Sequence, residues 1–324
     1  MLNFYATMFR RLNNILKSDE TTGFGAHSKD NSGRFYTKSG VPNIHKVGLD
    51  WLENISWYHS LIRMTTGRFL LLVFSGYILI NLIFTFIYAV IGIDHLMGVK
   101  RGSAVQDFME IFFFSAQTFT TVGYGRISPL GSLTSFVATF EAFIGLLSFA
   151  IATGLFFARF SKPESHIRFS KKALISPYKE GKALMFRMAS FKNNSISEVE
   201  VKVLLAVKEE ENGDVVNKFY TLETAISRIN LLSLSWTVVH PINEKSPLFG
   251  LDGNAISSTP MEIMVFVKGF DEIYSNVVIT RTSYINTEIV CNVKFKIMYR
   301  ADVKNNTTIL DFALIDEYEN VSFQ

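Results

Sequence analysis

Two long segments that carry almost no charge limit what this chain can fold into. Residues 69–93 contain no charged side chain, and residues 132–160 contain only Glu141 and Arg159. At about 1.5 Å of rise per residue, a helix over either segment can cross the ~30 Å hydrocarbon layer of a bilayer. The sequence therefore predicts two transmembrane helices, an outer helix over 69–93 and an inner helix over 132–160.

The hexapeptide Thr120–Gly125 lies between the two predicted spans. Lipid cannot hydrogen-bond exposed backbone, so a loop at membrane depth has to line an aqueous cavity or be buried in protein. The carbonyl oxygens of Thr121, Val122, Gly123 and Tyr124, with the Thr121 hydroxyl, can form stacked rings that replace the hydration shell of K⁺. Glycine permits the backbone conformations that turn successive carbonyl groups to one side. We therefore predict that residues 120–125 are a K⁺ selectivity filter.

A shorter apolar segment, residues 105–119, precedes the filter and cannot cross the bilayer. We expect a pore helix whose C-terminal end points at the ion cavity, where the negative end of the helix dipole favours a cation. Asp107 near its start suits the positive end of the same dipole. One filter loop can surround an ion only in several copies, so we expect a homotetramer with the ion path on its four-fold axis.

Basic residues flank both spans on the side away from the filter. Lys46, Arg63 and Arg68 precede the outer helix, and Arg159 and Lys162 follow the inner helix. The positive-inside rule then places both termini in the cytoplasm and the filter mouth outside. The predicted localisation is the plasma (inner) membrane, with a multi-pass topology.

The chain is predicted to have four parts. Residues 1–45 are polar with several glycines, and we expect a flexible N-terminal arm. Residues 46–66 carry apolar and aromatic residues at helical spacing, which favours an interfacial slide helix; a helix packed on the soluble domain is the alternative. Residues 67–163 form the transmembrane pore domain, and residues 164–324 form a cytoplasmic domain.

The hydrophobic pattern changes to period two after Lys162-Pro163. Strand-like runs cover 183–189, 199–205, 262–267 and 293–297, separated by turn signals. Several short strands over this part of the chain favour an all-β sandwich. The pattern does not indicate a helical regulatory domain or a nucleotide-binding domain.

Four further motifs resemble those of one family. They are Ala158-Arg-Phe-Ser-Lys-Pro163, Lys182-Ala-Leu-Met-Phe-Arg187, His240-Pro-Ile-Asn-Glu-Lys-Ser-Pro-Leu-Phe249 and Gly269-Phe-Asp-Glu-Ile-Tyr-Ser-Asn-Val-Val-Ile-Thr-Arg-Thr-Ser-Tyr284. With the filter, they make the chain similar to the inward rectifier potassium channels, closest to the prokaryotic branch, from about residue 46 onward. The resemblance implies an immunoglobulin-like cytoplasmic β-sandwich, a tetramer and a pore that continues below the membrane. It also implies a constriction at an apex loop that contains Gly269, Phe270, Asp271, Glu272 and Ser275, with Phe270 and Ser275 nearest the axis.

The inner helix is expected to carry the gate. Gly145 and Gly154 are candidate hinges, although close packing is the commoner reason for such glycines. Phe157 lies where the resemblance places the helix-bundle narrowing, and its ring can close the path by dewetting or can face lipid. Glu141, the one acid of this helix, either braces the back of the filter or lines the pore.

The chain departs from the family's pattern at three positions. Phe149 stands where strong rectifiers carry an acid that holds Mg²⁺ or polyamines, so block by that route is doubtful and rectification is expected to be weak. Gln117 replaces a Glu that many relatives place near the filter as its support. Arg126 stands where most K⁺ channels have Asp, and four arginines at the outer mouth would repel cations. No cofactor is expected, and K⁺ is the permeant ion.

Basic residues near the inner leaflet have two interpretations. They are a positive-inside flank that needs no ligand, or a surface for anionic lipid headgroups, a role that the family gives to this region. The candidates are Arg68, Arg159, Lys162, Arg168, Lys171 and Lys172. The other Lys and Arg are scattered along a chain of net charge +3, so nucleic-acid binding is not indicated.

Two other functions fit parts of the pattern. A two-span ligand-gated K⁺ channel of another subfamily would need a nucleotide-binding regulatory domain, which the sequence does not show. A membrane-anchored β-sandwich that senses or scaffolds, with a filter-like loop that does not conduct, would be separated by K⁺ flux. An enzyme is not indicated, because no nucleophile–base pair, metal-spaced cluster or phosphate loop stands out.

Overall fold

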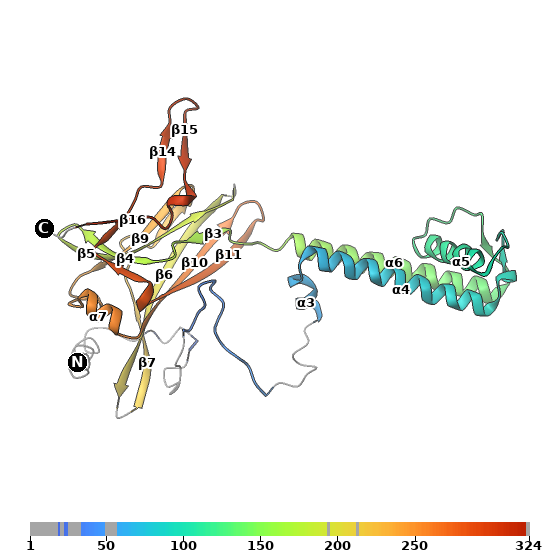
Figure 1. The fold of residues 1–324 in the computed structure, drawn as a ribbon, viewed down its shortest axis with the longest axis horizontal. Helices are drawn as coiled ribbons and strands as arrows, with labels where there is room; N and C mark the ends of the chain where they lie inside the picture. The colour runs from blue at the N-terminus through green and yellow to red at the C-terminus, as the bar shows by residue number, and fades with distance from the viewer. Residues whose placement is uncertain are drawn as a thin grey trace. The chain divides into compact units, whose positions relative to one another are not determined.

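The computed structural model describes residues 19, 23–24, 34–48, 57–192, 195–211 and 214–321. The chain divides into two compact units. The helical unit is residues 47–162, and the β unit combines residues 163–324 with residues 1–46 (Figure 1).

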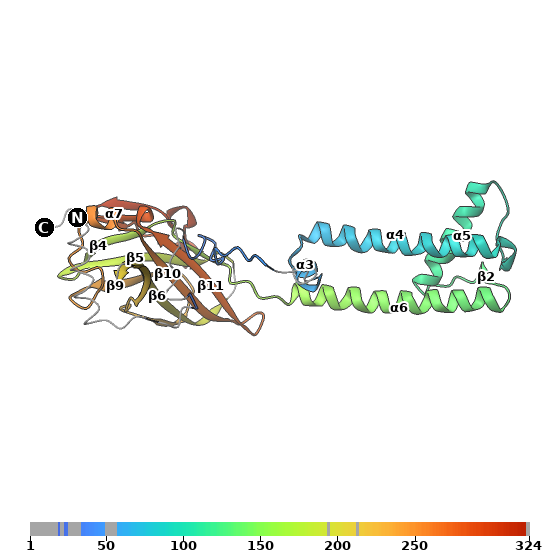
Figure 2. The ribbon, with the colours of Figure 1, turned by 90° about the horizontal axis from the view of Figure 1, so that it is seen from below.

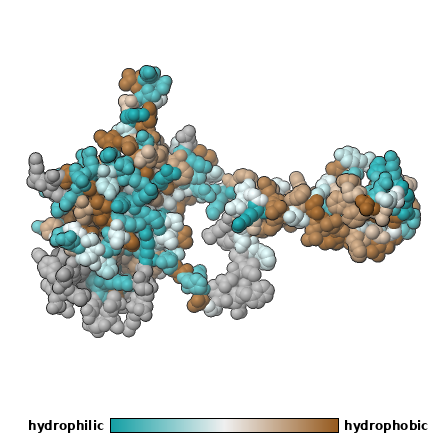
Figure 3. All heavy atoms as spheres, in the orientation of Figure 1, coloured by the Kyte–Doolittle hydropathy of each residue, from teal (hydrophilic) through white to brown (hydrophobic). Residues whose placement is uncertain are grey.

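The helical unit contains four α-helices in its described residues. They are α3 (Trp57–Arg63), α4 (Thr66–Ile91), α5 (Ala104–Phe119) and α6 (Ser132–Phe160), with the short η2 (Ile93–His95), β1 (Leu96–Met97) and β2 (Ser128–Pro129) between them. α4 and α6 run alongside each other, and α5 packs against both at the end away from α3 (Figures 1 and 2). α4 and α6 are long and apolar enough to cross a membrane, and apolar residues dominate the visible face of this unit in Figure 3.

Local backbone chemistry sets the helix ends. The outer helix begins at Thr66, whereas the sequence predicted residue 69. It ends at Ile91 instead of the predicted residue 93, because Gly92 has a φ of +109° and stops the helix. The pore helix begins one position early, since the hydroxyl of Ser103 accepts a hydrogen bond from the Gln106 amide at 3.3 Å. α6 has the bounds expected from the sequence.

The interfacial helix expected over 46–66 is shorter in the described residues. Residues 46–48 are not helical, and α3 covers only Trp57–Arg63. Thr65 has an extended backbone that separates α3 from α4, so one helix cannot continue into the span. Residues 49–56, which the prediction also included, lie outside the described part of the chain.

The β unit is a sandwich of two five-stranded sheets. The first has the order β11-β10-β6-β7, with β8 also paired to β6; the second has the order β12-β4-β5-β3, with β9 also paired to β5. Strands of the first sheet are β6 (Ile196–Glu211), β7 (Asp214–Thr221), β8 (Arg228–Leu231), β10 (Met261–Asp271) and β11 (Asn276–Ile285). Strands of the second are β3 (Ile167–Phe169), β4 (Ala173–Tyr178), β5 (Gly181–Ser190), β9 (Ser235–Ile242) and β12 (Ile289–Cys291). The pairs are antiparallel, except that β12 runs parallel to β4.

Smaller elements complete the β unit. They are the pair β13 (Val293–Phe295) and β16 (Tyr318–Asn320), the hairpin β14 (Tyr299–Asp302) and β15 (Thr307–Leu310), the helix α7 (Gly253–Ser258), and the turns η3 (Asn286–Glu288) and η4 (Phe312–Leu314). The hairpin of β14 and β15 projects from the body of the sandwich in Figure 1.

Strand β6 is buried on both of its faces. Alternate residues from Val199 to Leu205 are buried in the core between the two sheets. Leu204 and Ala206 point to the opposite face, yet they are only 2% and 3% exposed. That outer face therefore needs a cover other than the second sheet.

Residues 34–43 supply this cover. Phe35 and Tyr36 are buried and form one cluster with Leu204, Phe219 and other residues of the outer face. The prediction of a flexible arm over 1–45 is therefore wrong for this segment. The segment is polar on average, but its two aromatic side chains pack on an apolar face of the sheet, and average composition does not indicate such packing. Most of residues 1–33 lie outside the described part of the chain.

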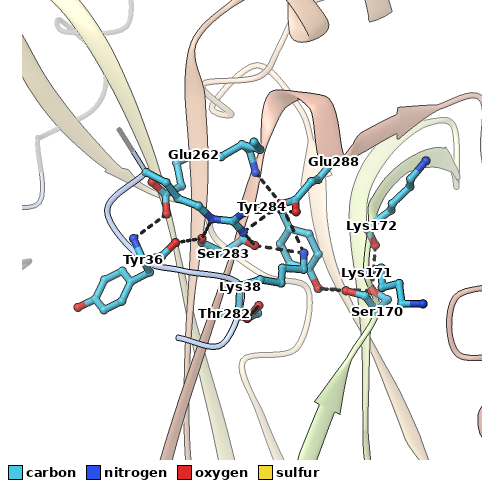
Figure 4. Close-up of polar contacts among 12 residues, drawn as sticks. Tyr36, Lys38, Ser170, Lys171, Lys172, Glu262, Thr282, Ser283, Tyr284 and Glu288 are labelled. Carbon is cyan, nitrogen blue, oxygen red and sulfur yellow. Dashed lines mark hydrogen bonds and ion pairs between the residues drawn. The ribbon is translucent and has the colours of Figure 1, made fainter. Parts of the chain in front are cut away.

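A buried carboxylate anchors the same segment by accepting hydrogen bonds from its backbone amides (Figure 4). Glu262 on β10 is 4% exposed, and its two oxygens accept from the amides of Phe35 at 2.6 Å and Tyr36 at 3.1 Å. The hydroxyl of Ser283 on β11 donates to the Tyr36 carbonyl at 2.7 Å. Both strands thus bind the backbone of the N-terminal segment directly.

Charged side chains add to this anchor. Arg34 forms an ion pair with Glu288 at 3.0 Å. The Nζ atom of Lys38 lies 3.6 Å from the centroid of the Tyr284 ring (Figure 4). Burial lowers the pKa of Lys38 to about 8, although the nearby carboxylate of Glu288 favours the charged form.

Replacing Glu262 with alanine is expected to release residues 34–43. A hydrogen bond to a charged acceptor is worth about 1.5–3 kcal/mol, so the loss of two should accelerate amide exchange at Phe35 and Tyr36 by at least about 100-fold. Hydrogen–deuterium exchange on the full chain measures this rate, with Glu319→Ala, an exposed residue of β16, as the control. Unchanged protection at Tyr36 would show that Glu262 is not the anchor.

Candidate ion pathway

The C-terminal end of α5 positions the loop Thr120–Gly125. The amides of Val122 and Gly123 donate to the carbonyl of Gln117 at 2.9 and 3.4 Å. The hydroxyl of Thr120 donates to the carbonyl of Ala116 at 2.7 Å. Carbonyl groups of the last helical turn, Gln117 above all, thereby hold the first half of the loop. Gln117, predicted to support the filter, makes these contacts through its backbone.

Every second residue of the loop has a left-handed backbone conformation. Thr121, Gly123 and Gly125 have φ values of +58°, +52° and +78°, whereas Val122 and Tyr124 stay outside the left-handed region. Such alternation turns successive amides to one side, which leaves the carbonyl oxygens on the other. β-branched residues rarely adopt left-handed φ values, so the conformation of Thr121 costs about 1–3 kcal/mol. Backbone strain of this kind is found mainly at functional sites. The loop can present a row of oxygens to a cation.

One chain forms one wall of this site. Residues 120–125 are all exposed, Val122 to 52% and Tyr124 to 78%. Within the single chain, α5 leaves most of the Tyr124 ring uncovered. Any packing of this ring has to come from outside the chain.

Glu141 of α6 has no exposed surface. Its Oε2 accepts a hydrogen bond from the Tyr88 hydroxyl at 2.6 Å, and its Oε1 accepts one from the Ser115 hydroxyl at 2.5 Å. Of the two roles considered, bracing the pore helix agrees with these contacts, whereas a pore-lining group would be exposed. Ser115 lies on the last turns of α5, close to Gln117.

Gly145 and Gly154 on α6 have different surroundings. A Cβ at Gly145 would collide with the carbonyl oxygen of Phe119, the last residue of α5, whereas a Cβ at Gly154 would meet nothing within 4 Å. Gly145 is therefore a close-packing position, and its interpretation as a hinge is not supported. Phe149 and Phe157 are each 73% exposed in the single chain, so both rings can reach either an aqueous path or lipid.

Arg126 does not present an unpaired charge. Its guanidinium lies 2.7 Å from the carboxylate of Glu110 on α5, with side-chain exposures of 46% and 17%. The repulsion of cations expected from four arginines is therefore reduced, because each pair is nearly neutral at a distance. Glu110 is not among the residues predicted from the sequence, since nothing in the local pattern links a pore-helix acid to a residue beyond the loop.

The predicted apex residues lie in the hairpin of β10 and β11. Asp271 is fully buried, and its Oδ1 accepts hydrogen bonds from the amides of Ile273 at 2.9 Å and Tyr274 at 3.2 Å. Its carboxylate therefore shapes the turn, which differs from a role in lining a constriction. The hairpin also contains Gly269, Phe270, Glu272 and Ser275.

Arg159, one of the lipid candidates, is engaged inside the helical unit. Its guanidinium donates to the carbonyls of Leu61, Ile62 and Met64, at 3.1 Å from Ile62 and 2.6 Å from Met64. It also lies 4.6 Å from the centroid of the Phe69 ring. These contacts give Arg159 a structural role, because its guanidinium binds backbone carbonyls at the end of α3.

The other basic candidates remain at the surface. Lys171 lies 3.4 Å from the carboxylate of Asp316, an exposed contact that is worth little. Two candidates belong to the helical unit and three to the β unit. The exposed candidates are Arg68, Lys162, Arg168, Lys171 and Lys172.

Known families match both units. Residues 76–162 match the family described as "Ion channel", and residues 167–324 match the "Inward rectifier potassium channel C-terminal domain". The helical unit, with two candidate spans and the loop Thr120–Gly125 between them, is therefore the pore region of an ion channel.

Two relatives narrow this class. The inward rectifier potassium channel Kirbac3.1 of Paramagnetospirillum magnetotacticum is 33% identical over 261 residues, which cover 79% of this chain and 86% of the relative. The G protein-activated inward rectifier potassium channel 4 of Homo sapiens is 28% identical over 294 residues, which cover 83% and 69%. The chain belongs to the inward rectifier potassium channel family. The resemblance seen in the sequence and the predicted fold class are confirmed, and the family is one of membrane channels rather than enzymes.

Proposed function

We propose that four copies of this chain form a K⁺-selective channel in the plasma (inner) membrane, with both termini in the cytoplasm. The observation that carries the proposal is the backbone alternation at Thr121, Gly123 and Gly125 in an exposed loop that the pore helix holds. One chain offers one row of oxygens, so a closed coordination shell requires symmetric copies around an axis. Several similar sites in a row allow an entering ion to push the next one out.

The proposal is tested with purified protein in liposomes. We expect rubidium uptake driven by a K⁺ gradient, little or no sodium uptake, and a four-fold assembly by cross-linking in the membrane. A protein that passes sodium as readily as potassium, or that assembles with another symmetry, would contradict it.

We place the gate on α6 and at the apex hairpin, with Phe157 as the ring that narrows the bundle. Phe157→Ala is expected to raise the basal open probability about tenfold, because a dewetted constriction loses its apolar ring. Single-channel recording in bilayers measures this. The matched control is Phe136→Ala, an equally exposed Phe on the same helix, at 70%. Equal open probabilities in the wild type and Phe157→Ala would place the gate elsewhere.

Rectification is proposed to be weak, because the exposed position 149 carries a phenylalanine. An aromatic ring offers no carboxylate to hold internal Mg²⁺ or a polyamine. The exposed basic residues Arg68, Lys162, Arg168, Lys171 and Lys172 are proposed to contact anionic lipid headgroups, each worth about 1 kcal/mol near a charged leaflet.

The pair of Arg126 and Glu110 gives a test at the outer mouth. Glu110→Gln leaves four unpaired arginines, so we expect a roughly twofold lower K⁺ conductance at low salt and a smaller loss at high salt, where the charges are screened. Single-channel conductance at two ionic strengths measures this. The double variant Glu110→Gln/Arg126→Gln should restore conductance. A single variant with wild-type conductance at low salt would mean that the arginine points away from the ion path.

A further inference from the structure

Asn81 is a polar residue with no exposed surface in the middle of the apolar helix α4. A buried amide in a membrane span is unfavourable unless it is hydrogen-bonded, so its partners indicate its role. Its Nδ2 donates to the carbonyl of Tyr77 at 2.7 Å, which fixes the orientation of the amide. Its Oδ1 then faces the hydroxyl of Ser115 on the pore helix at 3.1 Å.

Ser115 is the point where three helices meet. Its hydroxyl lies 3.1 Å from Oδ1 of Asn81 on α4 and 2.5 Å from Oε1 of Glu141 on α6. The backbone carbonyl of Asn81 also lies within reach, at 3.3 Å. The single proton of this hydroxyl is shared among these acceptors on α4 and α6. Because such contacts are directional, whereas apolar packing is not, they set the rotation of α5 about its own axis.

This contact lies next to the groups that hold the filter. The carbonyl of Gln117, on the same final turns of α5 as Ser115, accepts from Val122 and Gly123. α4 makes a second contact with this part of α5, where the rings of Tyr77 and Phe119 meet edge to face at 5.7 Å. A rotation of α5 that broke the contact to Ser115 would displace the Gln117 carbonyl and the loop with it.

We propose that Asn81 is a positioning residue for the filter, which acts through Ser115 to hold the last turns of the pore helix. The outer helix thereby contributes to ion selectivity although it lines no part of the filter loop. This inference rests on the proposed function of the loop as a K⁺ filter.

The test compares K⁺/Na⁺ permeability ratios of purified tetramers in bilayers. Asn81→Leu removes the amide at similar volume, and Ser115→Ala removes the single hydroxyl. Hydrogen bonds between membrane helices average about 0.6 kcal/mol, so assembly should survive. We expect each variant to lower the permeability ratio about tenfold, and the double variant to lower it no further than Ser115→Ala does, because Asn81 acts only through the Ser115 hydroxyl, which also contacts Glu141. Ser115→Thr, which keeps the hydroxyl, should restore the ratio.

Thr134→Val is the matched control. Thr134 lies on α6, is 1% exposed, and its Oγ1 has no hydrogen-bond partner within the described part of the chain. Removal of this buried hydroxyl should leave the permeability ratio unchanged.

The outcomes separate this inference from the proposed function. A wild type that does not select K⁺ overturns the proposed function. A selective wild type whose ratio is unchanged in Ser115→Ala overturns the role of Asn81 alone, and this smaller variant decides the matter if Asn81→Leu does not assemble. Loss of thermal stability with an unchanged ratio likewise identifies Asn81 as structural only.

Discussion

Gly123→Ala is expected to abolish K⁺ flux while the tetramer still forms. Gly123 has a φ of +52°, and a Cβ in the left-handed region costs about 1–2 kcal/mol in each of four subunits. A Cβ at this position meets nothing within 4 Å in the single chain, so the cost is conformational rather than steric. The peptide is expected to relax by turning its carbonyl away from the ion path, which removes one ring of ligands.

Rubidium uptake into liposomes measures this loss, and cross-linking reports the assembly. Gly76→Ala is the matched control, because Gly76 lies inside helix α4 and its Cβ would also meet open space. The control should conduct normally. Wild-type uptake by Gly123→Ala would remove the assignment of residues 120–125 as the filter.

Gly145→Val is expected to be the most damaging single change on α6. Its Cβ would collide with the carbonyl oxygen of Phe119 at the end of the pore helix. Because both groups are backbone or rigidly attached to it, the helices must separate, at a cost of about 1–3 kcal/mol per subunit for overpacking. We expect loss of selective flux together with a lower thermal stability of the tetramer.

Gly154→Val provides the comparison on the same helix, since a Cβ there meets nothing within 4 Å. The pair is measured by flux and by the temperature at which the tetramer dissociates. Equal dissociation temperatures for the two variants would show that α6 and α5 are not in close contact at Gly145. A large change of gating in Gly154→Val without a loss of stability would support Gly154 as a hinge.

The contrast between Gly123 and Gly145 separates two uses of glycine in one pore. At Gly123 the backbone conformation itself needs the missing Cβ, whereas Gly145 lies in a regular helix and needs only the space. The first variant should lose conduction with an assembly of unchanged stability, and the second should lose conduction and form a less stable assembly. Flux alone would not distinguish them, so the assembly measurement is essential.

The two long apolar helices and the loop between them were predictable because they depend on neighbouring residues. A run without charge of bilayer length has few alternatives to a membrane helix, and its ends need only local signals such as Gly92 or Ser103. The β-sandwich was predictable in the same way, from hydrophobic residues that recur at every second position. These properties are averages over a segment, so single misjudged residues move a boundary by a few positions and no more.

The N-terminal segment shows where such reasoning stops. The run from Val203 to Val207 is apolar without interruption, which is typical of a strand covered on both faces. This signal indicates that a cover exists, but it does not name the cover. Phe35 and its anchor Glu262 are 227 residues apart in the chain, and no spacing rule connects them.

Length, periodicity and glycine placement were thus enough to predict two long apolar helices, the loop between them and an all-β domain, since each arises from contacts along the chain. The partners of buried groups required the three-dimensional arrangement. Glu141 accepts a hydrogen bond from Ser115, and the missing Cβ of Gly145 leaves room for the Phe119 carbonyl. Arg126 forms an ion pair with Glu110. These contacts exist because segments that are separate in the sequence approach each other in space. Hydrogen bonds and steric contacts act over a few ångströms, so they depend on which surfaces meet and not on how far apart residues stand in the sequence.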